Sequence, residues 1–323
     1  MKYKLVIGSR GSKLALWQAN HIKTELQNLY PDLELSIKVI VTQGDKNLDT
    51  PLPLIGGKGL FTKAVDEALL NGDVDLAVHS LKDLPTLEHK LLTIAAIPPR
   101  GNVSDALVSR QSGGINGLPQ HAVVATGSLR RAAQLKHLRP DIRTVDIRGN
   151  VDTRLRKLKE NDWHGLIIAK AGLERIGLQP KYTIEFKKSE MLPAAGQGAL
   201  AVVCRRENDQ LLQMLSSLNC LNTRLEVTAE RAFLHALDGG CHVPVGAFAK
   251  VRDRLLELEG CIVSIDGSEM VRDILITQPL EIKPDSLDEA TTLAEKAGRS
   301  LAETLKADGG VELLRLAESG RLE

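Results

Sequence analysis

The chain has 323 residues, of which 43% are hydrophobic and 26% charged, and its formal net charge is +1. The length allows two or three domains, and the composition is that of a soluble globular protein. Because the net charge is close to zero, nothing attracts the whole chain to nucleic acid or to a membrane, and a basic binding site must be local.

The N-terminus and the cysteines narrow the protein class further. The apolar stretch Leu5–Ile7 is too short for a signal peptide, and no apolar run is long enough to span a membrane. We therefore expect a cytoplasmic protein without a membrane partner, unless a transit peptide has been removed. The cysteines Cys204, Cys220, Cys241 and Cys261 form no CxxC pair, which argues against a metal site and against a disulfide scaffold.

In the first hundred residues, short apolar runs alternate with helical patterns. Strands are predicted at Lys4–Ile7, Leu35–Val41 and Asp75–His79. Helices are predicted from Ser12 onward and over Leu60–Leu70. This alternation indicates a parallel or mixed sheet that is covered by helices.

The same pattern restarts after the breaker Pro98–Gly101 and changes near residue 222. The predicted strands are Ala106–Ser109, Ala122–Thr126, Ile142–Asp146, Gly165–Ala169 and, after a second breaker at Pro193–Gly198, Ala199–Cys204. Helices are predicted over Ser128–Leu138 and Asp152–Lys159. A helix over Asn222–Leu237, extended segments at Leu255–Ile265 and Met270–Thr277, and a helix from Ser286 follow.

These elements predict an α/β fold with three domains. Domain 1 is expected to comprise residues 1–98 and 199–216, and domain 2 residues 104–192, both of α/β type. Domain 3 is expected at residues 221–323, of α+β type. The two breakers are interpreted as two crossings of one hinge between the first two domains, which are built alike.

The first candidate binding segment is Gly8–Ser12, between a strand and a helix. Free backbone N–H groups and the helix dipole favour an anion at such a junction. Arg10 adds a planar set of donors that suits carboxylates. The alternative is a plain turn in which Ser12 caps the helix.

A second candidate is Thr126–Arg131, which again joins a strand to a helix. Ser128 is the expected cap, and Arg130 and Arg131 lie in the first helical turn, where positive charge opposes the helix dipole. Sequences break local rules of this kind most often at functional sites. A solvated helix end is the alternative.

These arginines belong to a basic run from Thr126 to Glu160. Ten lysines and arginines face four acids there, which leaves a charge of +6. Part of the run is expected to be a solvated face. Arg148, however, follows a strand and Arg154 lies on the next helix, and ligands of open α/β sheets bind where strands end. The pattern indicates a polyanionic ligand, and the lack of interleaved aromatic residues disfavours nucleic acid.

The segment His79–Pro85 supplies a candidate catalytic group. Lys82 and Asp83 are adjacent, directly after a predicted strand. A carboxylate there could stabilise a developing cation and handle protons, although a surface Lys-Asp turn is the alternative. His79 ends an apolar strand and is interpreted as a buried, hydrogen-bonded histidine rather than a base.

Cys241 lies on the glycine-rich turn Gly239–Pro244 and is the most accessible of the cysteines. An accessible thiol can act as a nucleophile, whereas the other three cysteines are interpreted as structural. The segment Gly56–Gly59 lacks the spacing of a phosphate-binding loop, which argues against nucleotide hydrolysis.

Together and in this order, these segments resemble the porphobilinogen deaminase family. The segments that carry the resemblance are GSRGSKLALWQA from Gly8, GGKGLF from Gly56, AVHSLKDLP from Ala77, TGSLRRAAQL from Thr126, IRGNVDTRL from Ile147, PAAGQGAL from Pro193 and GGCHVPVG from Gly239. The resemblance implies two domains similar to periplasmic binding proteins, joined by a hinge, and a third domain that bears a cofactor.

The resemblance also implies roles for individual residues. It places a dipyrromethane cofactor on Cys241 through a thioether and makes Asp83, with Lys82, the catalytic pair. Other residues match a mobile loop over the cleft, namely Lys58 and Phe61. The implied cofactor-binding residues are Cys241, Asp83, Lys82, Ser128, Arg130, Arg131 and Arg148, and the implied substrate-binding residues are Arg10, Ser12, Arg148, Arg154 and Arg175.

The implied function is the head-to-tail condensation of four porphobilinogen molecules, with loss of ammonia, to hydroxymethylbilane in heme biosynthesis. We expect a monomeric transferase. The chemistry agrees with the residues, because each pyrrole carries two carboxylates and the growing chain is a polyanion. The alternative is a two-domain anion receptor or the effector module of a regulator, which shares the architecture. Such a receptor does not need a third domain that bears a cofactor.

Overall fold

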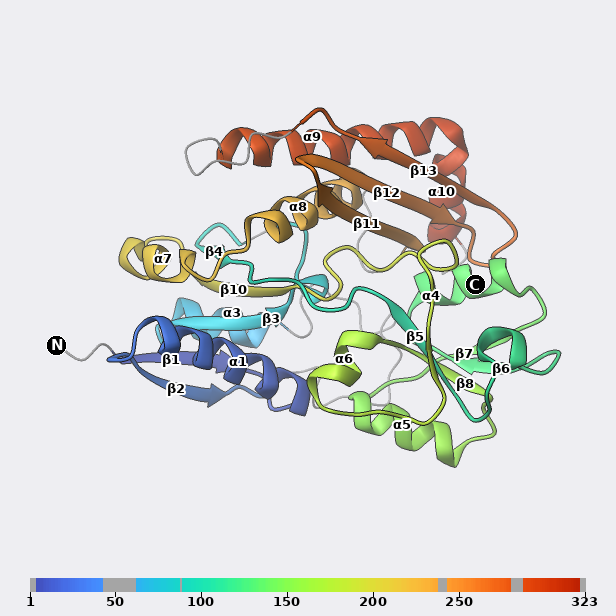
Figure 1. Cartoon of the computed structure of the whole chain (residues 1–323), viewed down its shortest axis with the longest axis horizontal. Helices are drawn as coiled ribbons and strands as arrows, with labels where there is room; N and C mark the ends of the chain where they lie inside the picture. The colour runs from blue at the N-terminus through green and yellow to red at the C-terminus, as the bar shows by residue number, and fades with distance from the viewer. Residues whose placement is uncertain (1–3, 43–61, 88, 238–242, 280–286, 320–323) are drawn as a thin grey trace. The chain divides into compact units, whose positions relative to one another are not determined.

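Figure 1 shows a computed structural model of the chain, which describes residues 4–42, 62–87, 89–237, 243–279 and 287–319. The described residues form two compact units. Unit 1 comprises Met1–Gly101, Gly172–Leu178 and Gly198–Cys220, and unit 2 comprises Asn102–Ala171, Gln179–Gln197 and Leu221–Glu323. The chain passes from unit 1 to unit 2 after Gly101 and back after Gln197, close to the two predicted breakers, and it also contributes the short segment Gly172–Leu178 to unit 1.

Unit 1 is built on a five-stranded sheet with the order β2-β1-β3-β10-β4. Its strands are β1 (Lys4–Ser9), β2 (Glu34–Val39), β3 (Leu76–Ser80), β4 (Leu92–Ala96) and β10 (Leu200–Arg205). The pairs β1–β2 and β1–β3 are parallel, whereas β10 is antiparallel to both β3 and β4. The strand β10 thus joins this sheet only after the chain has passed through residues of unit 2.

Apolar helix faces explain why the sheet of unit 1 is covered. Its helices are α1 (Lys13–Leu29), α3 (Lys63–Leu70), the short η2 (Leu81–Asp83) and α7 (Asp209–Ser216), and α6 (Lys170–Arg175) enters from unit 2. Ile22 and Leu26 of α1 and Leu215 of α7 lie in one core with Ile7 and Leu76 of the sheet. Helices α1 and α7 therefore cover the same face.

Unit 2 contains a second five-stranded sheet, with the order β7-β6-β8-β5-β9. Its strands are β5 (Asp105–Ser109), β6 (Val123–Ala125), β7 (Arg143–Val145), β8 (Gly165–Ala169) and β9 (Thr183–Glu185), and its helices are η3 (Gly114–Gly117), α4 (Leu129–Leu138) and α5 (Val151–Glu160). Again three strands are parallel, and β5 is antiparallel to both of its neighbours. The two sheets share one topology.

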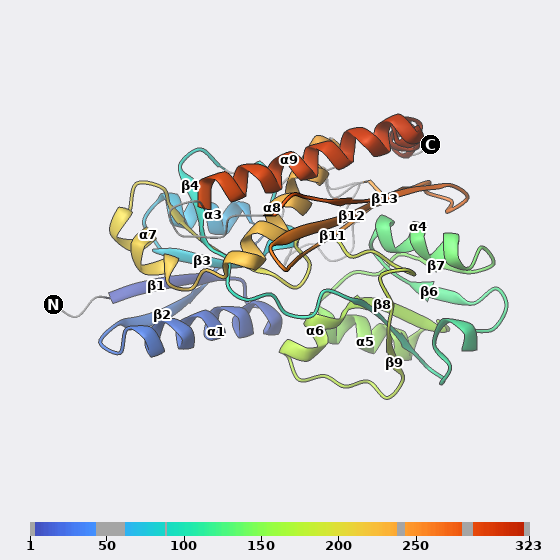
Figure 2. The ribbon, with the colours of Figure 1, turned by 45° about the horizontal axis from the view of Figure 1, so that its top comes forward.

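The C-terminal part of unit 2 is an antiparallel three-stranded sheet with helices on one face (Figure 2). The strands are β11 (Val245–Arg252), β12 (Leu255–Val263) and β13 (Met270–Ile276), and the helices are α8 (Leu221–Ala236), α9 (Leu287–Leu305), η5 (Lys306–Gly310) and α10 (Val311–Ser319). The other face packs on α4 through Ala133, Leu192, Phe248 and Cys261.

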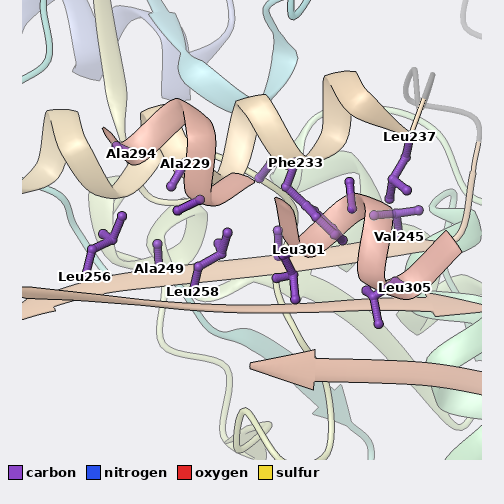
Figure 3. Packing of buried hydrophobic residues seen from close by; sticks show 14 of the residues in the cluster. Ala229, Phe233, Leu237, Val245, Ala249, Leu256, Leu258, Ala294, Leu301 and Leu305 are labelled. Carbon is purple, nitrogen blue, oxygen red and sulfur yellow. The ribbon is translucent and has the colours of Figure 1, made fainter. Parts of the chain in front are cut away.

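Two glycines let the helices α8 and α9 approach this sheet and each other closely. Figure 3 shows Phe233 of α8 among the side chains that fill the core between helices and strands. A Cβ atom at Gly260 of β12 would lie 2.6 Å from the Phe233 ring, and one at Gly298 of α9 would lie 2.4 Å from the Ala229 carbonyl oxygen. Neither position leaves room for a side chain.

The predicted fold class is confirmed, with two α/β domains and a C-terminal α+β domain. Local sequence signals did not predict the strands β4, β9 and β11 or the helices α6, α7 and α10. The helix predicted over Leu60–Leu70 has Thr62 as its cap residue and begins at Lys63. The residues 43–61, with Lys58 and Phe61, lie outside the described residues.

Candidate functional site

In unit 1, the predicted anion-binding junction and the predicted catalytic segment lie at one cavity. The cavity has a volume of about 70 Å³, and its walls include Arg10, Ser12, Ser80 and Asp83. Arg10 and Ser12 follow β1, and Ser80 and Asp83 end β3 and η2. Because β1 and β3 are neighbouring parallel strands, their carboxyl ends bring these residues together.

Ser12 caps helix α1, as the sequence predicted. Its Oγ accepts a hydrogen bond of 3.2 Å from the backbone N–H of Ala15. The capping role and a place at the cavity wall are compatible, because a hydroxyl that accepts one hydrogen bond can still donate its own proton. Ser12 can therefore cap the helix, as the plain-turn alternative has it, and also donate a hydrogen bond into the cavity.

Asp83 lies on the 3-10 turn η2 with its side chain exposed, and Lys82 beside it is half-buried. The backbone fixes the turn, because the Leu81 N–H donates to the Ala199 carbonyl oxygen at 3.0 Å and the Leu84 N–H donates to the Leu81 carbonyl oxygen at 3.1 Å. The first bond connects the turn to the segment that precedes β10. Asp83 is therefore an exposed carboxylate on a firmly held turn.

His79 is buried, as predicted, but the structure does not show the predicted hydrogen bond at its Nε2 atom. Its Nε2 atom is buried and has no hydrogen-bond partner among the described residues. Burial, helped by the positive charge of Arg10, lowers the pKa of His79 to about 4. The ring is therefore neutral near pH 7. It contributes a polar but uncharged group to the cavity wall that Arg10 and Asp83 share.

The sequence analysis missed Gln18, another buried polar side chain at this cavity. Gln18 lies on the apolar face of α1, and its Nε2 donates to the Ser80 Oγ at 2.8 Å. A glutamine among the apolar positions of an amphipathic helix was the signal that could have identified it. The bond holds the end of β3 against α1 and so fixes the start of the turn that carries Asp83.

In unit 2, the adjacent arginines of α4 are not a solvated helix end. Arg130 and Arg131 are buried, and both pair with the fully buried carboxylate of Asp105 at 2.7 Å. Asp105 is the first residue of β5, and the sequence analysis gave it no role. Ser128 occupies the cap position of α4, but its side chain makes no capping hydrogen bond, contrary to the prediction.

Arg148 lies on the turn before α5, and Arg154 of α5 binds this turn. The Arg154 Nε donates to the Gly149 carbonyl oxygen at 2.7 Å. Gly149 has a φ of +113°, and a Cβ atom there would lie 2.7 Å from the Thr153 side chain, so this turn requires glycine. Two guanidinium nitrogens of Arg148, Nε and Nη2, are buried without a partner among the described residues. Buried donors of this kind are the expected signature of an anion site.

The remainder of the basic run is surface, as part of it was expected to be. Arg139 pairs with Asp141 at 2.7 Å, and Arg156 pairs with Glu160 one helical turn away at 2.9 Å. The Arg139 guanidinium holds the pKa of Asp141 well below its usual range. These pairs lower the positive charge that the outer face of the run offers to a ligand.

Arg175 is not among the residues that line the cavity of unit 1. Its Nη2 donates to the Gly198 carbonyl oxygen at 2.6 Å, and its guanidinium lies 5.6 Å from the centre of the Trp17 ring. Burial lowers its pKa. In this structure Arg175 therefore connects α6 to α1 and to the segment before β10.

Two of the described cysteines are unsuited to nucleophilic attack. Cys204 and Cys261 are buried, and burial raises the pKa of each thiol to about 11. Cys220 is half-buried. Cys241, the predicted attachment point, lies outside the described residues.

The described ranges contain no group of three or more metal-binding side chains. Within the same ranges, no helix is long and apolar enough to cross a bilayer.

Comparisons with known proteins cover nearly the whole chain. Residues 5–213 match the family model "Porphobilinogen deaminase, dipyromethane cofactor binding domain", and residues 224–307 match "Porphobilinogen deaminase, C-terminal domain". The chain is 45% identical to the porphobilinogen deaminase of Syntrophomonas wolfei over 96% of this chain and 97% of that one. Identity to the corresponding protein of Geotalea daltonii is 45%, over 96% of this chain and 94% of that one.

Among solved structures, the similarity is weaker. The methionine binding protein MetQ matches with a TM-score of 0.42 and 16% identity, over 71% of this chain and 93% of that one. The VFT2 domain of Bordetella pertussis BvgS matches with a TM-score of 0.42 and 11% identity, over 67% of this chain and 85% of that one.

Proposed function

Because this chain belongs to the porphobilinogen deaminase family, we propose that it joins four porphobilinogen molecules head to tail, with loss of ammonia at each step, to give hydroxymethylbilane. The protein is a transferase of tetrapyrrole biosynthesis. Within the structure, the observation that carries the proposal is the meeting of Arg10, Ser12 and Asp83 at one cavity. This substrate requires a basic group that binds its carboxylates and a carboxylate that stabilises the cation formed from it.

The dipyrromethane cofactor of the family can be tested against the residues present. Its two pyrrole rings bear four carboxylates, so its site must offer cationic donors. Arg148 offers two buried guanidinium nitrogens that no described residue uses, and Arg130 and Arg131 add two further guanidinium groups. The residues therefore fit such a group. When bound, it supplies the primer to which the first substrate is joined.

We assign the binding of this cofactor to Arg130, Arg131, Arg148, Ser128, Lys82 and Asp83, with a thioether to Cys241. This assignment rests on the family motif and on the buried donors of unit 2. Charge-assisted hydrogen bonds to each carboxylate contribute about 1.5–3 kcal/mol. Lys58 and Phe61 remain predicted residues of a loop over the cleft.

The chemistry on the substrate is assigned to Asp83. Its carboxylate accepts hydrogen bonds from pyrrole N–H groups and stabilises the positive charge that remains on the substrate ring when ammonia departs. The α-carbon of the last ring of the growing chain forms the new carbon–carbon bond to the cationic substrate. That carbon then loses its proton, which Asp83 can accept. Lys82, the neighbour of Asp83 in the chain, is assigned to a substrate carboxylate by the family motif.

The substrate carboxylates are assigned to the remaining basic residues. Arg10 and Ser12 act from the cavity of unit 1, Arg148 acts from the turn before α5, and Arg154 acts from α5 itself. Arg175 is assigned here by the family motif alone, since its Nη2 is engaged with Gly198. The receptor alternative receives no support from the named relatives. We propose that the enzyme works as a cytoplasmic monomer.

The test is to incubate the purified protein with porphobilinogen and to measure consumption, ammonia release and product mass together. We expect one ammonia per porphobilinogen consumed and a linear product of four rings. We also expect the purified chain to be heavier than its sequence by two substrate units less two ammonias. Binding of porphobilinogen without release of ammonia would contradict the proposal and favour the receptor alternative.

A further inference from the structure

Asp105 is a fully buried carboxylate for which the proposed chemistry has no use. Its Oδ2 accepts a hydrogen bond from the Arg130 Nη1 at 2.7 Å. Its Oδ1 accepts from the Arg131 Nε at 2.9 Å and lies 2.7 Å from the Arg131 Nη2. One carboxylate at the start of β5 therefore binds both arginines of the first turn of α4.

Further hydrogen bonds hold this cluster in one geometry. The Gln197 Nε2 donates to the Asp105 Oδ1 at 3.0 Å and to the Val103 carbonyl oxygen at 2.7 Å. The Leu192 carbonyl oxygen accepts from the Arg130 Nη1 at 2.7 Å and from the Gln134 Nε2 at 3.0 Å. The segment Pro193–Gly198, which the sequence analysis interpreted only as a hinge crossing, thus supplies Gln197 to orient Asp105.

Arg130 has donors that the cluster does not use. Two buried guanidinium groups bind the carboxylate of Asp105. A guanidinium group with unused donors can bind an anion through charge-assisted hydrogen bonds. The described residues bind Arg130 through its Nη1 alone, so its Nε and Nη2 can bind that anion.

We propose that Asp105 is the positioning residue of Arg130 and Arg131, which fixes both guanidinium groups so that the Nε and Nη2 donors of Arg130 receive one carboxylate of the pyrrole ligand. Gln197 acts through Asp105 by holding its carboxylate in place. This inference rests on the proposed function, and it concerns how the same site binds its ligand. It also explains how two adjacent arginines persist at a helix N-terminus, where the dipole disfavours them.

The experiment measures cofactor loading rather than turnover. The wild-type chain and its variants are produced in a host that cannot make porphobilinogen, and intact mass is followed while porphobilinogen is titrated in. Asp105→Asn keeps the shape and removes the charge, and Asp105→Glu restores the charge on a longer arm. Asp141→Asn is the matched control, because it removes the partner of Arg139 at the other end of α4. Circular dichroism and melting curves report the fold.

We expect folded Asp105→Asn to need at least about tenfold more porphobilinogen than the wild type for half-maximal loading. Asp105→Glu should regain part of the loss, and Asp141→Asn should load like the wild type. Loading of Asp105→Asn at wild-type concentrations would overturn the inference. If Asp105→Asn does not fold, Gln197→Leu decides, because it keeps all three charges: a rise of about threefold or more supports the inference, and no change overturns it.

Failure of the proposed function gives a different result. In that case the wild-type chain itself neither gains the mass of two substrate units less two ammonias nor releases ammonia. A wild type that loads normally, together with an Asp105→Asn variant that also loads normally, leaves the proposed function intact and refutes only the positioning role.

Discussion

At the residue scale, the wall of the cavity of unit 1 contains an exposed carboxylate and an uncharged imidazole. Asp83 is exposed at the cavity wall, whereas His79 is buried and neutral. The same wall contains Arg10, whose charge favours a carboxylate ligand and disfavours a protonated His79. Physical environment, rather than residue type alone, therefore makes Asp83 the candidate for proton transfer.

Asp83→Asn should give a folded protein that loses nearly all turnover. Asparagine keeps the shape and one acceptor oxygen but loses the charge and the basicity, and general acid–base help alone contributes about 10²–10⁴-fold. Asp83→Glu keeps the charge and should retain some activity. Initial rates and intact masses after brief exposure to porphobilinogen provide the measurement.

The matched control for Asp83 is Asp73→Asn, which removes the partner of Lys38 on an exposed part of the same unit. It should leave the rate unchanged. Wild-type rates in Asp83→Asn would show that another group performs the chemistry.

His79 should make the stability of the protein depend on pH. Its folded pKa of about 4 lies below the usual value of 6.5, so between these values the unfolded chain binds a proton that the folded chain does not. The free energy of unfolding should therefore fall as the pH drops from 6.5 to 4, with a contribution of about 3 kcal/mol from this residue.

His79→Asn removes this titration, and denaturant unfolding at several pH values measures the difference. His235→Asn, at an exposed position of α8, is the control. A wild type and a His79→Asn variant with parallel pH profiles would show that His79 is protonated equally in both states.

At the scale of elements, buried carboxylates of α8 compensate for an open sheet edge. β11 is an edge strand, and its outward backbone N–H groups need partners. Glu230, fully buried, accepts from the N–H of Ala249 at 2.8 Å and from the N–H of Gly196 at 2.7 Å, and Glu226 accepts from the N–H of Val251 at 3.2 Å. Carboxylates of α8 thus accept the hydrogen bonds that a neighbouring strand would accept from β11.

Gly298→Ala should destabilise the C-terminal part of unit 2 without touching the site. The new methyl group would collide with the Ala229 carbonyl oxygen of α8 at 2.4 Å, and forced separation of packed elements costs about 1–3 kcal/mol. Ser300→Ala, on the exposed face of the same helix, should change the free energy of unfolding by less than about 0.5 kcal/mol. Equal denaturation midpoints for the two variants would contradict the close approach of α8 and α9.

At the scale of the whole molecule, two sheets of identical topology are each completed by a strand from a distant part of the sequence. β10 follows the long excursion through unit 2, and it lies between β3 and β4. β5 occupies the equivalent fourth position in the sheet of unit 2, between β8 and β9. Each sheet therefore pairs strands that lie far apart in the sequence.

Only Cys241 should carry the covalent cofactor of the assembled protein. Cys241→Ser should abolish both the mass increment and the turnover, because a serine hydroxyl cannot form the thioether. Cys204→Ser should keep both and lose about 1–3 kcal/mol of stability, since it introduces a hydroxyl into the core of unit 1. Intact mass and denaturant unfolding distinguish the two. A full mass increment in Cys241→Ser would move the attachment point elsewhere.

What the sequence by itself determined is local. The helix start at Ser12 depends on residues within one helical turn, which is why it was predictable. The long apolar strands β1, β3 and β8 were predictable for a related reason, because a buried strand needs a run of apolar residues. The ordered motifs also sufficed to indicate the family.

What only the tertiary structure decided depends on residues far apart in the chain. Asp105 lies 25 positions before Arg130, and Gln197 lies 92 positions after Asp105, so no local pattern marks them as partners. The three-residue strand β9 is too short to show a period. Sequence identifies which groups are charged, whereas packing determines which charges are paired, buried or left to bind a ligand.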